Sequence, residues 1–397
     1  MKVLVADKLP EEALAALGEA GFQVTADAAL KEGALVAKVS ELEPEVLIVR
    51  STKVPREVLE AGPIALVIRA GAGVNNVDCG AASQLGIYVA NCPGKNAIAV
   101  AELTWGLILS LDRKIPDAVQ DIRGGRWRKK HYGKARGLFG QTLGLIGLGA
   151  IGREVALRAK AFGMPVVAWS RSLTPERAEA EGWTFASSPH DVARQADVVS
   201  VHVALTDETR GMIDASFFAA MKSDACFVNT SRGGVVDGDA LSAALSGGLW
   251  AGLDVWNVQP SSGEEPFVDP LGNSPQVYGT HHGGASTAQA QSAVALEAIR
   301  VAVSFKDTGA VPNCVNLTAS SPAPASLVVR HLDRVGVLAA VLSALKEAKV
   351  NVQEMQNVLF SGPGAAACAT IRVSKAPDAQ LLERLASLEH VLDVQAK

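Results

Sequence analysis

Apolar runs of strand length alternate with amphipathic segments along most of the chain. In the first 91 residues such runs cover 3–6, 46–49, 66–68 and 87–90, and a helical pattern covers 11–20. Strands that alternate with helices in this way form parallel sheets. The pattern therefore predicts an α/β domain, and this domain lacks a glycine-rich turn after its first strand.

A second α/β unit is predicted from about residue 95 to residue 282. Its predicted strands are the apolar runs 142–146, 166–169, 198–201, 226–228 and 252–255. The segment 97–111 is apolar nearly all round, which predicts a buried helix at an interface between domains or subunits. The helical segment 287–305 should return the chain to the first domain.

A linker and a small module are predicted at the end of the chain. Residues 317–325 are rich in Ser, Pro and Ala, which is typical of a linker. Residues 326–397 then show the order strand, helix, strand, strand, helix, strand. This βαββαβ order is typical of a ferredoxin-like unit, and such modules usually bind or regulate.

Composition and charge exclude several classes of protein. A net charge of −4 over 397 residues gives no electrostatic footprint for nucleic acid or an anionic membrane. The five cysteines are scattered without Cys-x-x-Cys spacing, so we expect no disulfide framework, no zinc site and no other metal site. The N-terminus reaches Asp7 after one short apolar run, unlike a signal peptide, and the longest apolar stretch contains Glu102 and is too short to span a bilayer. We therefore expect a soluble cytoplasmic protein.

The most specific motif is the run 141–153, in which a strand breaks into Gly-x-Gly-x-x-Gly and continues as a helix. Gly147 allows a tight turn, Gly149 lets backbone N–H groups approach a pyrophosphate, and Gly152 lets the helix lie close to the strand. The second strand, 166–169, completes a βαβ unit. This context favours a dinucleotide site over the alternative of a structural turn without ligand.

The end of that second strand bears on the choice between NAD and NADP. NAD enzymes place an acidic residue about 20 residues beyond the glycines, where it holds the ribose hydroxyls. Here Ser170 takes the acidic position and Arg171 follows, which suits a 2′-phosphate. We therefore expect NADP to be accepted as well as NAD. The alternative is that Arg171 stacks on the adenine.

Three loops after predicted strands hold candidates for chemistry, because open α/β sheets bind ligands beyond the carboxyl ends of their strands. Arg232 could bind a carboxylate through two hydrogen bonds, or it caps a surface loop. His281 and His282 lie in a glycine-rich turn, where one histidine as acid and base is more plausible than a metal pair, since adjacent side chains diverge. Asp254 is an acceptor either for a nicotinamide carboxamide or for its own turn.

These motifs resemble those of the D-2-hydroxyacid dehydrogenase family. The resemblance covers nearly all of the chain and includes the segments 49–54, 69–78, 91–96, 101–103 and 205–211. The chain is most similar to members that oxidise 3-phospho-D-glycerate and carry a C-terminal ACT domain. This implies a Rossmann-type doubly wound parallel sheet at 96–285, inserted in a flavodoxin-like substrate-binding domain at 1–95 and 286–316, and a ferredoxin-like ACT domain at 326–397.

The resemblance also implies roles for single residues. Arg232 would bind the substrate carboxylate, His282 would act as acid and base, and Asp254 would lie near the nicotinamide. The cofactor site would further include Ala150, Ile151, Val203, Thr209 and Thr230. The substrate site would include Arg50 and Arg69 for a phosphate, together with Ser51, Lys53, Gly71, Ala72 and Gly73. Further cations for the phosphate are Lys95 and the basic run 126–130 of a partner subunit.

The chain departs from the family at Gln259, where a glutamate is usual. That glutamate pairs with the histidine and raises its pKa, whereas an amide can orient the ring by hydrogen bonding but adds no charge. We therefore expect His282 to have a lower pKa and the enzyme to be weaker in carbonyl reduction at neutral pH. Formate dehydrogenases of the same superfamily resemble the chain at this loop and are a minor alternative.

The resemblance to an ACT domain rests on 329–338 and 350–352. It implies that a small, serine-like amino acid binds between two chains at His331, Asp333 and Asn351; a dimerisation module without ligand is the alternative. We expect a homodimer or homotetramer.

The expected function is the NAD(P)-dependent oxidation of 3-phospho-D-glycerate to 3-phosphohydroxypyruvate, the first step of the phosphorylated pathway of L-serine biosynthesis. A glyoxylate or hydroxypyruvate reductase is one alternative. A protein of low turnover that senses NAD(P) and amino acids is another.

Overall fold

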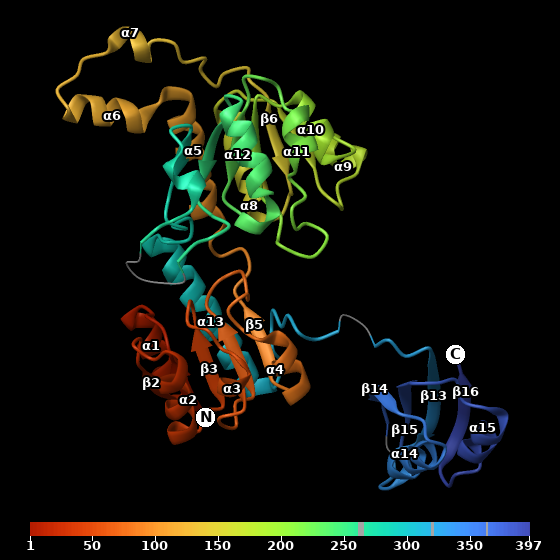
Figure 1. Ribbon diagram of the computed structural model, residues 1–397. Helices are drawn as coiled ribbons and strands as arrows, with labels where there is room; N and C mark the ends of the chain where they lie inside the picture. The colour runs from red at the N-terminus through yellow and green to blue at the C-terminus, as the bar shows by residue number, and fades with distance from the viewer. Residues whose placement is uncertain (261–265, 319–320, 363) are drawn as a thin grey trace. The chain divides into compact units, whose positions relative to one another are not determined.

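The computed structural model describes residues 1–260, 266–318, 321–362 and 364–397. The chain divides into two compact units, Met1–Asn316 and Leu317–Lys397, and each is described by itself (Figure 1). Residues 319 and 320 of the expected linker lie outside the described residues. Its last residue, Ala325, already belongs to a strand, so the predicted linker is one residue too long at this end.

The first sheet of the larger unit has five parallel strands in the order β2-β1-β3-β4-β5. They are β1 (Lys2–Val5), β2 (Gln23–Ala26), β3 (Val46–Val49), β4 (Leu66–Arg69) and β5 (Tyr88–Asn91). The connecting helices are α1 (Glu11–Glu19), α2 (Glu32–Leu42), α3 (Arg56–Leu59) and α4 (Cys79–Leu85). Strand β2 is not among the predicted strands, because it is a partly exposed edge strand without an apolar run.

The second sheet has seven parallel strands in the order β12-β11-β10-β9-β6-β7-β8. They are β6 (Leu143–Ile146), β7 (Val166–Trp169), β8 (Thr184–Phe185), β9 (Val198–Val201), β10 (Cys226–Asn229), β11 (Trp250–Leu253) and β12 (Val277–Gly279). The five strands expected here are present, and the short edge strands β8 and β12 are additional. Since the strand order reverses at β6, the sheet has its switch point there, where such sheets bind dinucleotides.

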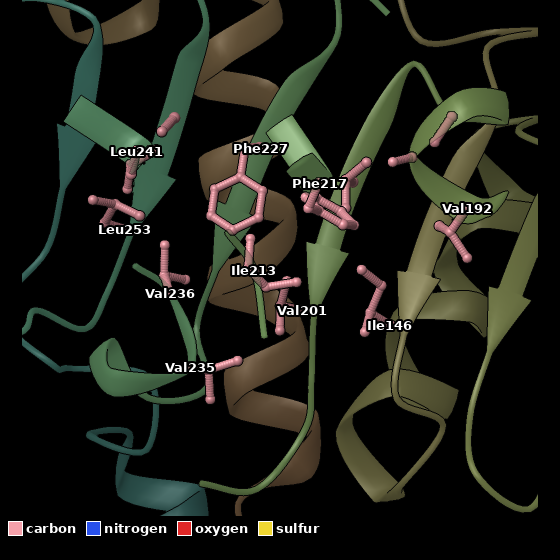
Figure 2. Packing of buried hydrophobic residues seen from close by; sticks show 14 of the residues in the cluster. Ile146, Val192, Val201, Ile213, Phe217, Phe227, Val235, Val236, Leu241 and Leu253 are labelled. Carbon is pink, nitrogen blue, oxygen red and sulfur yellow. The ribbon is translucent and has the colours of Figure 1, made fainter. Parts of the chain in front are cut away.

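Helices cover this second sheet and supply its core. They are α5 (Ala97–Arg113), α6 (Ile115–Arg123), α7 (Lys129–Tyr132), α8 (Ala150–Ala161), α9 (Pro175–Ala180), α10 (Pro189–Gln195), α11 (Ala215–Ala220) and α12 (Gly238–Ser246), with short 3₁₀ turns at Gly233–Val235 and Pro270–Asn273. As predicted, α5 is a buried helix, and it packs on α8, β10 and β11. On one face of the sheet, Ile146, Val201, Phe227 and Leu253 from four strands meet Phe217 of α11 (Figure 2).

The helix α13 (Ala288–Thr308) returns the chain to the first sheet, as its sequence predicts. Its buried residues Val294, Ala298 and Val301 share one apolar cluster with Val3 of β1 and Ile68 of β4. The two lobes of the larger unit are therefore joined by two crossings, one before α5 and one before α13.

The smaller unit confirms the predicted βαββαβ order. Its elements are β13 (Ala325–Leu332), α14 (Val337–Glu347), β14 (Val352–Leu359), β15 (Ala366–Val373), α15 (Ala379–Ala386) and β16 (Val391–Ala396). The strands form an antiparallel sheet in the order β14-β15-β13-β16. Across both units, none of the helices in the described ranges is long and apolar enough to cross a membrane.

Candidate active site

A cleft of about 1520 Å³ lies in the larger unit, where strands of both sheets end. Its walls come from loops that follow β1, β3, β4, β10, β11 and β12. These loops bring together Asp7, Arg50, Arg69, Arg232, Gln259 and His282. The structure thus gathers in one place the arginines and the histidine that the sequence singles out.

Of the four arginines that line this cleft, Arg50, Arg69 and Arg232 lie close enough for their charges to act on Arg69. No ion pair within 4.0 Å involves Arg50, Arg69 or Arg232 among the described residues, and the buried Nε of Arg69 has no hydrogen-bond partner there. Burial lowers the pKa of Arg69, and the charges of Arg232 and Arg50 lower it further against smaller opposing effects of Cys92 and Asp7. An anion that enters the cleft would relieve this repulsion and fill the open donor positions.

Two glycines make room for these guanidinium groups. A Cβ atom on Gly71, whose φ is +159°, would lie 1.8 Å from Nη1 of Arg69. A Cβ atom on Gly73 would lie 2.5 Å from Nη2 of Arg232. Side chains at these positions would displace the arginines, which explains why the loop after β4 contains glycine at both.

His282 faces the cleft from the turn after β12, with a backbone φ of +53° in the left-handed region. Its Nδ1 lies 2.8 Å from Nε2 of Gln259, so the expected hydrogen bond is present. Burial lowers the pKa of His282, and Arg232 lowers it further against a smaller opposing effect of Asp254. The amide of Gln259 can donate to or accept from the ring but adds no charge. The imidazole is therefore neutral at neutral pH.

Asp254 holds the histidine turn in place. Its Oδ1 accepts hydrogen bonds from the Thr280 hydroxyl at 2.6 Å and from Gly283 N–H at 2.8 Å, and its Oδ2 accepts from Gly284 N–H at 2.9 Å. The side chain is buried and is not part of the cleft wall. The sequence allows Asp254 to accept from a nicotinamide carboxamide or from its own turn, and in the structure it accepts from the turn.

The glycine turn after β6 has the sterics of a phosphate-binding turn. A Cβ atom on Gly147, whose φ is +99°, would lie 2.5 Å from the carbonyl oxygen of His202, and one on Gly152 would lie 2.1 Å from the carbonyl oxygen of Gly147. A Cβ atom on Gly149 would meet open space, which leaves room for a ligand to approach the backbone. Helix α8 starts at Ala150 and Ile151 without a side-chain cap or an acid in its first turn. The first N–H groups of α8 can therefore bind an anion.

The remaining cofactor candidates lie in loops beside β6. Ser170 and Arg171 follow β7, and Arg171 is exposed. The Thr206 hydroxyl lowers the pKa of Glu208 most, and the charge of Arg171 also lowers it, so Arg171 lies near the loop after β9 that contains Val203 and Thr209.

Two of these candidates use their hydroxyl groups within the protein. The Thr209 hydroxyl donates to the carbonyl oxygen of Ala204 at 2.6 Å. The Thr230 hydroxyl, after β10, lies 2.9 Å from the Thr104 hydroxyl in α5. Both therefore help to hold their loops in place.

Several expected substrate residues do not reach the cleft. Lys53 and Ala72 are not among its lining residues, and the ammonium of Lys95 lies 3.3 Å from a carboxylate oxygen of Glu297 in α13. In the basic run 126–130, Arg126 and Arg128 pair with Asp121 of their own chain. Ser51 does line the cleft, but its hydroxyl donates to Asp7 at 2.8 Å.

The cleft is also lined by Asp7, Asn75, Arg210 and Trp256, which are not among the residues predicted from the sequence. Asp7 follows a predicted strand directly, so the strand-end argument applied to Arg232 could have identified it.

In the smaller unit, His331 is buried. Its Nδ1 lies 2.8 Å from the carbonyl oxygen of Leu332, and its Nε2 lies 3.2 Å from Oδ1 of Asn357. With both nitrogens engaged in the unit's own structure, His331 is not available to an effector. Asp333 and Asn351 are exposed.

Comparison with known proteins agrees with this geometry. Residues 105–284 match the model of the D-isomer specific 2-hydroxyacid dehydrogenase, NAD binding domain. The chain is 42% identical to the D-3-phosphoglycerate dehydrogenase of Methanocaldococcus jannaschii over 297 residues, which are 74% of this chain and 55% of that protein. This chain thus spans about half the length of that relative.

Two further comparisons extend over whole proteins. The chain is 39% identical to the hydroxypyruvate reductase of Thermotoga maritima over 313 residues, 78% of this chain and 98% of that one. A crystal structure of a Thermus thermophilus protein is similar with a TM-score of 0.71 and 33% identity, covering 79% of this chain and all of that one. Because a relative at this identity is matched over nearly its full length, and the family's NAD-binding model matches the sheet that carries the glycine turn, the chain belongs to the D-isomer specific 2-hydroxyacid dehydrogenase family.

Proposed function

We propose that the protein oxidises 3-phospho-D-glycerate to 3-phosphohydroxypyruvate with a nicotinamide cofactor, the first step of the phosphorylated pathway of L-serine biosynthesis. The observation that carries this proposal is the cleft in which Arg50, Arg69 and Arg232, none of them ion-paired within the described ranges, lie with His282. A substrate with a carboxylate at one end and a phosphate at the other supplies anions for several guanidinium groups. Curated relatives named D-3-phosphoglycerate dehydrogenase, at 37–42% identity, support the same substrate.

Each residue of the cleft has its own part in the proposed reaction. The cofactor, bound at the glycine turn, supplies the hydride acceptor. Arg232 binds the substrate carboxylate, and Arg50 and Arg69 bind the phosphate. Nε2 of His282 takes the hydroxyl proton as the hydride leaves. This requires the tautomer with its proton on Nδ1, and Nδ1–H then donates to the carboxamide oxygen of Gln259 with the amide nitrogen and oxygen exchanged. Because the pKa of His282 is lowered, the ring is neutral and ready to accept this proton.

A reductase for hydroxypyruvate or glyoxylate is the second candidate, favoured by the match over 98% of the Thermotoga maritima hydroxypyruvate reductase. Such substrates have a carboxylate but no phosphate, so they would leave Arg50 and Arg69 without an anion. Because the pKa of His282 is lowered, less of the ring carries at neutral pH the proton that carbonyl reduction needs. Both points favour the phosphorylated hydroxy acid.

The smaller unit is proposed to be an ACT regulatory domain, on the strength of its βαββαβ order and antiparallel sheet. With His331 buried, Asp333 and Asn351 are the exposed candidates for a serine-like effector. A homodimer is proposed from α6, where the exposed side chains of Ile115, Val119 and Ile122 follow helical spacing along one face.

Turnover tests the proposed function. The chain should reduce NAD or NADP with 3-phospho-D-glycerate in an initial-rate assay, and hydroxypyruvate and glyoxylate should be poorer substrates in the reverse direction. Efficient reduction of hydroxypyruvate with no activity on 3-phospho-D-glycerate would favour the reductase. Binding of cofactor without turnover of these substrates or of formate would favour the sensor.

A Gln259→Glu variant should shift the pH profile of oxidation to higher pH. A carboxylate at this distance favours the imidazolium and raises the pKa of His282, by about one unit or more. Since oxidation needs the neutral ring, the acidic limb of kcat/KM against pH should move upward by that amount. The control is Gln276→Glu, which adds the same charge outside the cleft. Profiles of Gln259→Glu and the parent that overlay would contradict the role of Gln259.

An Arg171→Ala variant should lose affinity for NADP selectively. A guanidinium that binds a 2′-phosphate contributes charge-assisted hydrogen bonds, so KM for NADP should rise about tenfold or more while KM for NAD stays within about twofold. Arg158→Ala, in α8 and paired with Glu154, is the matched control. Equal increases for both cofactors would instead indicate stacking on the adenine.

A further inference from the structure

The carboxylate of Asp7 holds the loop that contains Arg50. Its Oδ2 accepts hydrogen bonds from the backbone N–H groups of Arg50 at 2.6 Å, Thr52 at 2.9 Å and Ser51 at 3.0 Å. Its Oδ1 accepts from the Ser51 hydroxyl at 2.8 Å. Asp7 follows β1 and the loop follows β3, and these strands are parallel neighbours, so the two segments meet at one edge of the sheet.

Three successive N–H groups that point at one oxygen form a typical anion-binding concavity. Here the protein's own carboxylate occupies it. The backbone of residues 50–52 is therefore not available to a substrate phosphate, and the loop can offer the cleft only side chains. Of these, the side chain of Arg50 carries the positive charge, and it lies near enough to Arg69 to lower the pKa of that group.

Asp7 is charged at neutral pH and, among the described residues, forms no ion pair with the arginines, although its charge slightly offsets the lowering of the pKa of Arg69. Burial raises the pKa of Asp7, but the hydrogen bonds from Arg50, Thr52 and Ser51 outweigh burial, and the pKa is lowered overall. Although Asp7 lines the cleft with Arg50 and Arg69, no ion pair joins it to either within the described ranges. Its hydrogen bonds come from the loop, three from backbone N–H groups and one from the Ser51 hydroxyl.

We propose that Asp7 is a positioning residue for the phosphorylated end of the substrate, because it fixes the backbone of residues 50–52 so that Arg50 extends into the cleft. This inference rests on the proposed function and adds a determinant of discrimination between phosphorylated and unphosphorylated 2-hydroxy acids. Asp7 acts through Arg50 and does not contact the reacting atoms.

The test compares two substrates in an Asp7→Asn variant of the full chain. The amide keeps the size of the side chain but loses the charge that binds the three N–H groups. KM for 3-phospho-D-glycerate should rise about tenfold or more, with kcat within about twofold, and KM for D-glycerate should stay within about twofold. The control Asp27→Asn makes the same exchange at an aspartate after β2, outside the cleft, where Oδ1 accepts from Ala29 N–H at 2.9 Å, and should not change the ratio of the two KM values.

A double-mutant cycle with Arg50→Ala separates positioning from general structural support. If Asp7 acts through Arg50, Asp7→Asn should raise KM no further in the Arg50→Ala background. The proposal would be overturned if the two substitutions raised KM by factors that multiply in the double variant, or if Asp7→Asn raised KM equally for both substrates. If Asp7→Asn does not fold, Ser51→Ala removes one hydrogen bond to Asp7 and should raise KM for the phosphorylated substrate alone; an unchanged KM would overturn the proposal.

The outcomes also distinguish this inference from the function on which it rests. An enzyme that oxidises 3-phospho-D-glycerate, with Arg50→Ala impaired and Asp7→Asn unimpaired, would refute the role of Asp7 only. A parent enzyme that oxidises D-glycerate but not 3-phospho-D-glycerate would refute both.

Discussion

The positive charge gathered around the buried guanidinium of Arg69 is the constraint on which the rest of the cleft depends. Arg50, Arg69 and Arg232 come from three different strand ends, and the charges of the other two lower the pKa of Arg69 beyond the effect of burial. Such an arrangement is unfavourable unless an anion binds, so the surrounding residues must hold the arginines in place. Gly71 and Gly73 leave room for the guanidinium groups of Arg69 and Arg232. Asp7 anchors the loop that contains Arg50.

The same positive charge lowers the pKa of His282, after the larger effect of burial. Asp254 fixes the turn after β12 through Thr280, Gly283 and Gly284, and this places His282 in the cleft. With an amide instead of a carboxylate at Gln259, nothing offsets the effect of burial and of Arg232 on the ring except the weaker influence of Asp254. The neutral imidazole is the form that can accept a proton, which is consistent with the proposed oxidation of a hydroxy acid.

The sequence predicts those features that depend on local pattern. The strand runs, the βαββαβ order and the glycine turn follow from periodicity and from the steric demands of short segments, and Arg232 and His282 follow from their places after strands. The rest depends on partners far away in the chain. Lys95 looks like a free cation until Glu297 is seen beside it, and His331 looks like a ligand until the fold buries it against Asn357. Asp7 contacts a loop more than 40 residues away, which no local pattern reveals.

The most direct test of this account is the affinity of the cleft for the two ends of the proposed substrate. Calorimetric titration of the full chain with 3-phospho-D-glycerate and with D-glycerate, in the presence of the reduced cofactor, measures the contribution of the phosphate alone. Charge-assisted hydrogen bonds to two arginines should make the phosphorylated ligand bind about tenfold tighter or more. Equal dissociation constants would show that Arg50 and Arg69 do not form a phosphate site and would contradict the account.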